Sequence, residues 1–102
     1  MVLDRLRMIL TDDELSRLVI CDDNPCKISI IADVHGMKCG QARRFINNVI
    51  NITRQGFSLV VIHGFHHGTA IKNMLASDFN NDRIILNQAD HNNPGRTILQ
   101  LA

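Results

Sequence analysis

The sequence predicts an α/β domain: a two-layer sandwich in which helices pack on a mixed four-stranded sheet. Two observations support this class. Short segments rich in β-branched and apolar residues, typical of buried strands, alternate with longer segments whose apolar residues recur every three or four positions, as on one face of a helix. The chain of 102 residues, 45% hydrophobic and 21% charged, also has the size and composition of one ordinary globular domain. The predicted order of elements is β-α-β-α-β-β.

The first 26 residues are predicted to be an N-terminal extension, short and helical, of a domain that spans residues 27–102. Thr11 and Glu14 have the spacing of a capping box, which begins a helix. We expect this helix to continue to about Cys21, because residues 22–25, Asp-Asp-Asn-Pro, are typical of a turn.

The next segments predict a β-α-β unit. Residues 27–35 form the first expected strand, which Gly36 ends, and residues 42–54 have the pattern of an amphipathic helix. Gly56 is expected in the C′ position that ends this helix, and residues 57–63 form the second strand. A right-handed crossover through the helix would make the two strands parallel neighbours.

The remaining segments predict a second helix and two more strands. The helix follows residue 68, and we expect four apolar residues on its inner face: Ile71, Met74, Leu75 and Phe79. Residues 83–87 and 97–101 are the last strands. The turn-forming residues 90–95 between them predict an antiparallel pair.

Composition and charge narrow the choice of partners. No apolar run approaches the roughly 20 residues that cross a bilayer, and charges interrupt the first apolar stretch, so we expect a cytoplasmic protein without a membrane contact. The odd number of cysteines (Cys21, Cys26 and Cys39) favours reduced thiols over disulfides or a zinc site. Residues 24–102 carry eight basic and four acidic side chains, which is compatible with a phosphate-bearing partner.

Asp33, His35 and His63 are the candidate catalytic residues. Asp33 and His35 are two residues apart at the carboxyl end of the first strand, so their side chains are expected to share a face. His63 ends the second strand. The carboxyl ends of parallel neighbours meet at one edge of a sheet, where open α/β folds bind ligands. Each histidine also has a purely structural interpretation, with its ring hydrogen-bonded to a backbone carbonyl.

The loop after the second strand is a candidate phosphate site. It runs from Gly64 through His66, His67 and Gly68 to Thr69, where a helix is expected to begin. Free N–H groups at such a loop and helix start bind phosphate. The spacing matches neither a Walker loop nor a dinucleotide fingerprint, so glycines that only turn the chain are the alternative.

These motifs, in this order, resemble the Smr (small MutS-related) domain family. Residues 32–36, Ala-Asp-Val-His-Gly, are similar to its leucine-aspartate-leucine-histidine-glycine strand end. Residues 61–64, Val-Ile-His-Gly, are similar to its second, histidine-glycine strand end. Gln41-Ala42 stands at the family's glutamate-alanine pair, and residues 95–101 are similar to its closing strand. The resemblance spans about residues 27–102, and it departs in the loop, where residues 65–68 are Phe-His-His-Gly.

The resemblance implies structure-dependent nicking of DNA or structured RNA. In such an enzyme we expect His35 to transfer protons, and Asp33 to orient it or to hold a divalent ion such as Mg²⁺ or Mn²⁺. His63 and the N–H groups near Gly64 and Gly68 would bind the scissile phosphate. Flanking phosphates would be held by basic side chains of the two helices: Arg43, Arg44 and Lys72.

Several alternatives stay open at this point. The alternative to a nuclease is a non-catalytic nucleic-acid-binding module in repair, recombination or ribosome-associated processes. A more remote alternative is a binder of a small phosphate or a metal. Cleavage would proceed either by metal-dependent hydrolysis or by attack of a ribose 2′-hydroxyl, which confines it to RNA. The absence of Trp and Tyr from the sequence favours recognition of backbone and shape over base stacking on aromatic rings.

Overall fold

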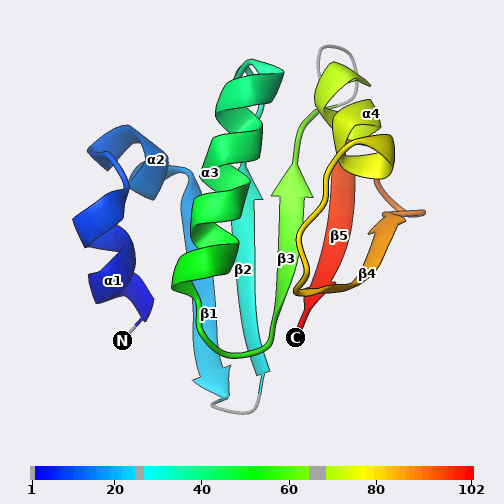
Figure 1. Cartoon of the computed structure of the whole chain (residues 1–102). Helices are drawn as coiled ribbons and strands as arrows, with labels where there is room; N and C mark the ends of the chain where they lie inside the picture. Colours follow the sequence, from blue (N-terminus) through cyan, green and yellow to red (C-terminus); the bar gives the residue numbers. More distant parts are fainter. Residues whose placement is uncertain (1, 25–26, 65–68) are drawn as a thin grey trace.

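The computed structural model describes residues 2–24, 27–64 and 69–102, and it confirms the α/β class (Figure 1). The sheet is mixed and has five strands in the order β1-β2-β3-β5-β4, so the predicted number of four is wrong. The strands are β1 (Leu18–Asn24), β2 (Lys27–Asp33), β3 (Phe57–Ile62), β4 (Ile84–Ala89) and β5 (Arg96–Leu101). The helices are α1 (Val2–Ile9), α2 (Asp12–Ser16), α3 (Cys39–Ile52) and α4 (Thr69–Ser77).

The additional strand is β1, which replaces the second half of the helix expected up to Cys21. The capping box itself is confirmed: the Glu14 N–H donates to Thr11 Oγ1 (3.1 Å), and the Thr11 N–H donates to Glu14 Oε1 (3.0 Å). The helix stops after Ser16, with Arg17 as its C-cap, because residues 18–21, Leu-Val-Ile-Cys, pair antiparallel with β2. β-branched side chains lose rotamer freedom in a helix and pack well on a sheet.

The two strand pairs predicted from the sequence are confirmed. β2 and β3 are parallel neighbours, with Asp33 opposite Ile62, and β4 and β5 are antiparallel. Gly56 is not the C′ residue of α3, because that helix ends at Ile52 and has Thr53 as its C-cap. A Cβ atom at Gly56 would lie 3.1 Å from the carbonyl oxygen of Leu101, so close backbone approach accounts for this glycine.

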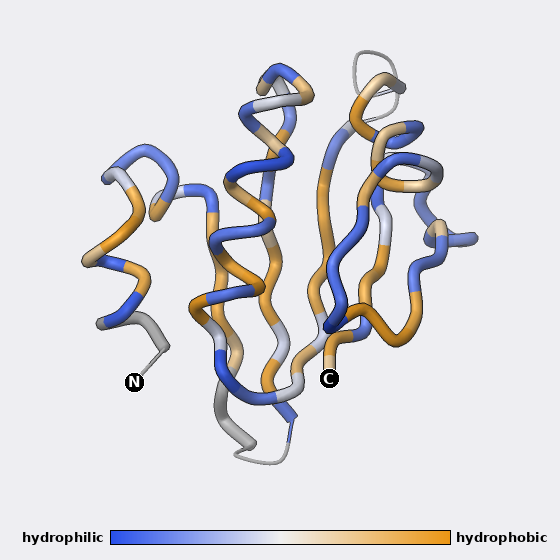
Figure 2. The backbone as a smooth tube through the Cα atoms, in the orientation of Figure 1, coloured by the Kyte–Doolittle hydropathy of each residue, from blue (hydrophilic) through white to orange (hydrophobic). Residues whose placement is uncertain are grey.

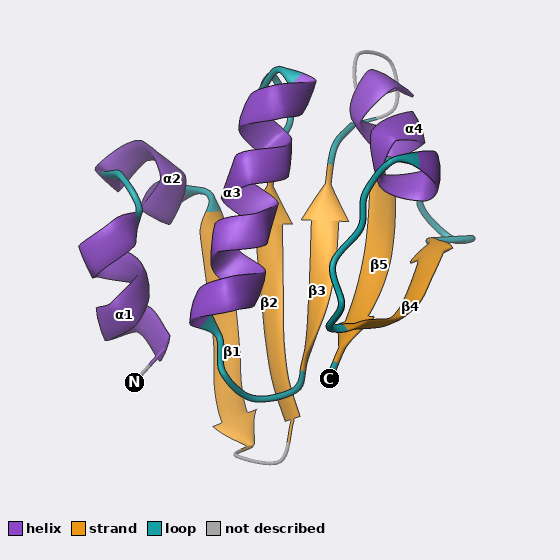
Figure 3. Ribbon diagram, in the orientation of Figure 1, coloured by secondary structure: helices purple, strands orange, loops and turns teal. Residues whose placement is uncertain are grey.

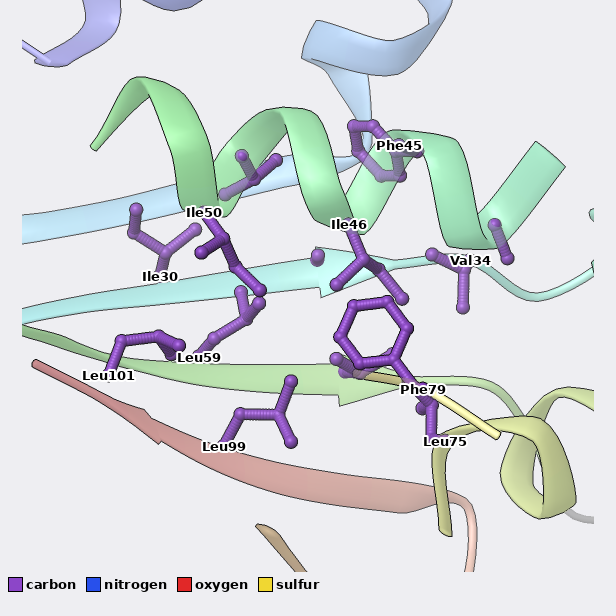
Figure 4. Close-up of a cluster of buried hydrophobic side chains, with 14 of the residues drawn as sticks. Ile30, Val34, Phe45, Ile46, Ile50, Leu59, Leu75, Phe79, Leu99 and Leu101 are labelled. Atoms are coloured by element: carbon purple, nitrogen blue, oxygen red, sulfur yellow. The ribbon is translucent and has the colours of Figure 1, made fainter. Parts of the chain in front are cut away.

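All the helices of the described residues lie on one face of the sheet, and the core lies between them (Figure 3). Figure 2 shows hydrophobic residues along the strands and hydrophilic positions alternating along α3. Figure 4 shows the packing of α3 against the sheet through Ile46 and Ile50. Phe79 lies beyond the end of α4 rather than on it, but it is buried in the same core.

The opposite face of the sheet, here called the open face, carries the alternate residues of each strand. Among the residues that the structure describes, no helix covers it (Figure 3). A row of aliphatic side chains crosses it from strand to strand, in the paired order Val19, Ile31, Val60 and Ile98. Their strand neighbours, such as Ile30 and Leu59, are fully buried on the helical face.

The N-terminal segment shares this core and sheet. Leu6 and Leu10 are buried in the same cluster as the side chains of α3, and β1 is hydrogen-bonded to β2. None of the described helices is both long enough and apolar enough to cross a membrane.

At the end of the sheet opposite the candidate site, the side chain of Arg83 joins several backbone segments by hydrogen bonds. The Arg83 guanidinium donates to the carbonyl oxygens of Ile50 and Thr53 at the end of α3, and to those of Gln55 and Ala102. A cation is favoured at the C-terminus of a helix, where carbonyl groups lack intrahelical partners. This side chain therefore joins the end of α3 to the start of β3 and the end of β5.

Candidate functional site

The two motifs predicted to form the site, which follow β2 and β3, lie together at one edge of the sheet. β2 and β3 both end there, and α3 and α4 both begin there (Figure 1). The Val34 N–H donates to the carbonyl oxygen of Ile62 (2.8 Å), so the parallel pairing continues past Asp33. Gly64 approaches His35 closely, since a Cβ atom on this glycine would lie 3.9 Å from His35 Cβ. The ends of the two strands are therefore in contact.

Asp33 and His35 form a hydrogen-bonded pair at this edge. His35 Nδ1 lies 2.5 Å from Asp33 Oδ1, which also accepts the backbone N–H of His35 at 3.1 Å. β2 ends at Asp33, so the pair is held by an Asx turn rather than by the alternation of a strand. The Asp33 and His35 side chains are 36% and 68% exposed, and His35 Nε2 has no hydrogen-bond partner among the described residues.

Two glycines shape the backbone around this pair. Gly36 has a φ of 81°, and Gly64 has a φ of 86°. Both angles lie in the left-handed region, where a side chain is strained. These two turns allow the chain to leave β2 and β3 at the edge.

His63 is placed differently from the expectation of a phosphate ligand. The residue is 1% exposed, and its ring nitrogens lie 2.9 Å from the carbonyl oxygen of Gly64 and 3.0 Å from Thr97 Oγ1. The N–H groups of His63 and Gly64 both donate to the carbonyl oxygen of Gly95. The ring and these N–H groups therefore join the end of β3 to β5 and its preceding turn.

Arg17 is a site residue that the sequence patterns did not reveal. Its Nη1 donates to the carbonyl oxygens of His35 (3.0 Å) and Asp33 (3.3 Å), and its Nε donates to Asp13 Oδ2 (3.3 Å). The Asp33 N–H donates to the Arg17 carbonyl oxygen (2.9 Å). The β1–β2 pairing therefore places this arginine beside the Asp33–His35 pair, here called the dyad. The sequence patterns favour a helix up to Cys21, and they contain no sign of the β1–β2 pairing that positions Arg17.

The dyad and Arg17 line a pocket on the open face. Its volume is about 360 Å³, at the small end of the range of ligand sites. Its lining is mixed, with five polar or charged residues and three aliphatic ones. The residues that line it are Asp13, Ser16, Arg17, Val19, Ile31, Asp33, His35 and Ile62.

The basic residues expected to hold flanking phosphates lie in the helical layer. Arg43 donates to Asp78 Oδ2 (2.8 Å) and to the Asp78 carbonyl oxygen (2.9 Å), which links α3 to the end of α4. Arg44 is exposed on α3, and Lys72 is half-buried on α4.

The loop that was expected to cradle a phosphate is described only at its ends. Thr69 is exposed at the first position of α4, and Gly64 follows β3. The predictions for His66, His67 and Gly68 concern residues outside the described ranges, so the phosphate cradle stays a prediction.

A divalent ion would find few ligands in this pocket. Among the described residues, no cluster of three or more His, Cys, Asp or Glu side chains could hold a metal ion. Asp33 and Asp13 are the carboxylates of the pocket, and they bind His35 and Arg17. Mg²⁺ commonly takes one or two carboxylates together with substrate phosphates. These residues therefore do not form a metal centre by themselves.

No protein-family model matches this chain, and neither do any curated protein or solved structure. The resemblance to the Smr family therefore stays a prediction from the sequence motifs.

Proposed function

We propose that this protein binds nucleic acid at the pocket beside Asp33 and His35, and that it nicks the bound strand there. The single observation that carries the proposal is the Asp33–His35 pair, whose ring nitrogen Nε2 has no partner among the described residues. A carboxylate on one imidazole nitrogen fixes the ring, so that the other nitrogen exchanges a proton with a substrate. Arg17 adds a cation at the same pocket.

The chemistry open to this pair is proton transfer at a phosphodiester. The attacking oxygen, from water or from a ribose 2′-hydroxyl, loses its proton to His35 Nε2 as it bonds to phosphorus. The bond from phosphorus to the leaving ribose oxygen breaks, and that oxygen takes a proton from the imidazolium. Asp33 acts as the group that orients the His35 ring through Nδ1.

A non-catalytic binding module is the second candidate, and the placement of His63 favours it. A second proton-transfer group is common in phosphodiester cleavage, but the His63 ring is buried with both nitrogens hydrogen-bonded. On this alternative Asp33 and His35 are structural partners, and the same pocket binds phosphate without cutting.

Salt dependence tests phosphate binding, which both candidates require. On duplex DNA, log affinity is expected to fall with log salt at a slope of about −0.9 per phosphate neutralised. Arg44→Ala, on the half of α3 nearer the site, is expected to flatten that slope by about one unit. Arg54→Ala is the matched control, since it removes the same charge beyond the far end of α3. Fluorescence anisotropy at four salt concentrations measures both slopes; affinity that does not change with salt would contradict the proposal.

A further inference from the structure

The pocket beside the dyad includes three aliphatic side chains of the sheet, here called its floor, that phosphate binding alone does not explain: Val19, Ile31 and Ile62. Val19 is 55% exposed, although it lies within a strand, and Ile31 and Ile62 line the same hollow. Exposed apolar surface beside a polar site marks a place where a ligand contributes apolar surface of its own. A phosphate group has no apolar surface to contribute.

The registers place this aliphatic floor beside the charged groups. Ile31 precedes Asp33 by two residues on β2, so their side chains share the open face. Arg17, the residue before β1, lines the same pocket as Val19 of that strand. Ile62 is opposite Asp33 on β3. A ligand at the dyad therefore contacts a cation on one side and aliphatic carbon beneath it.

Arg17 has donors left for such a ligand. Its Nε and Nη1 are used by Asp13 and by the carbonyl oxygens of the Asx turn, whereas Nη2 donates to no described residue. A guanidinium that is already held in place binds a phosphate oxygen with little further loss of side-chain freedom.

We infer that the pocket takes an unpaired nucleotide, with the face of its base on Val19, Ile31 and Ile62 and a phosphate at Arg17. This inference rests on the proposed function and specifies its substrate class as single-stranded segments or loops. A base in a duplex has both faces stacked on its neighbours, so only its edges and backbone are accessible. The floor is aliphatic, so it supplies the apolar contact that aromatic residues supply in other single-strand binders.

The test compares full-length protein on three labelled probes of one sequence: a single strand, a hairpin with an unpaired loop, and a blunt duplex. Fluorescence anisotropy at fixed salt is expected to give at least about tenfold tighter binding of the single strand and the hairpin than of the duplex. Val19→Thr keeps the shape and charge of the side chain but puts a hydroxyl under the base. It is expected to weaken single-strand binding about threefold to tenfold and to leave duplex binding unchanged.

Ile85→Thr is the matched control, since Ile85 is a 68% exposed β-branched residue on β4, outside the pocket. Thermal melts confirm that both variants fold. Duplex binding as tight as single-strand binding, or a Val19→Thr protein that binds the single strand like wild type, would overturn the inference and leave the proposed function intact. Absence of binding to all three probes would overturn the proposed function, and the inference with it.

Discussion

Replacement of His35 by alanine is expected to lower the nicking rate by about 10²–10⁴-fold, the usual cost of removing a proton-transfer group. Binding is expected to change by less than about twofold, because the imidazole acts mainly on the transition state. Asp33→Asn should reduce the rate in the same direction, since it keeps the shape of the side chain and removes the charge that holds Nδ1. Rates are measured under single-turnover conditions on a nicked-product gel, with affinity measured on the same substrate.

His91→Ala is the matched control for this experiment, because His91 is exposed in the turn between β4 and β5. The Asp33–His35 pair is largely exposed, and surface ion pairs contribute only about 0–1 kcal/mol to stability. The His35 variant should therefore stay folded, and a loss of activity would report on chemistry. Nicking by the His35→Ala protein at the wild-type rate would remove the catalytic role and favour the binding module.

Leu6→Ala is expected to lower the free energy of unfolding by about 2–5 kcal/mol, the typical cost of truncating a fully buried leucine. Leu6 lies on α1 and is 0% exposed, in the same hydrophobic cluster as Phe45 and Ile46 of α3. The effect would show that the N-terminal residues stabilise the whole fold, since α1 precedes residues 27–102, the range predicted from the sequence to be the domain. Urea denaturation followed by circular dichroism measures the change.

Met8→Ala is the matched control for Leu6→Ala, since it truncates a side chain of the same helix. Met8 lies on the same helix but is 85% exposed, so its truncation should change stability by less than about 0.5 kcal/mol. Similar unfolding free energies for the Leu6→Ala and Met8→Ala proteins would contradict the burial of α1. They would mean that the N-terminal residues are a dispensable extension in solution.

The strand pairs could be predicted because local patterns determine them. Residues 27–33 and 57–62 are rich in β-branched and apolar residues and are joined through one amphipathic helix, so the crossover rule alone makes them parallel. β1 could not be predicted in this way. Its short apolar run follows a capping box, and Leu15, Leu18 and Val19 also have helical spacing. Pairing with β2, which begins at Lys27, decides between the two structures, and the helical spacing of these residues does not contain that information.

The candidate site was predictable in part for the same reason. Asp33 and His35 are two residues apart, so local geometry brings them together, although the Asx turn does this rather than strand alternation. The burial of His63 depends on Thr97, 34 residues away, and on the Gly95 carbonyl. The position of Arg17 depends on the β1–β2 register. No spacing within one motif contains that information.

Chemical-shift mapping on ¹⁵N-labelled protein tests most directly the claim that nucleic acid binds beside Asp33 and His35. A hairpin RNA and the corresponding DNA hairpin, each with an unpaired loop, are titrated into the wild-type chain at low salt. The account predicts that the largest shifts of either titration occur at residues 33–36, at Arg17 and at Val19, around the pocket of the open face. Shifts confined to the helical layer around Arg44 and Lys72, or no shifts with either hairpin, would contradict it.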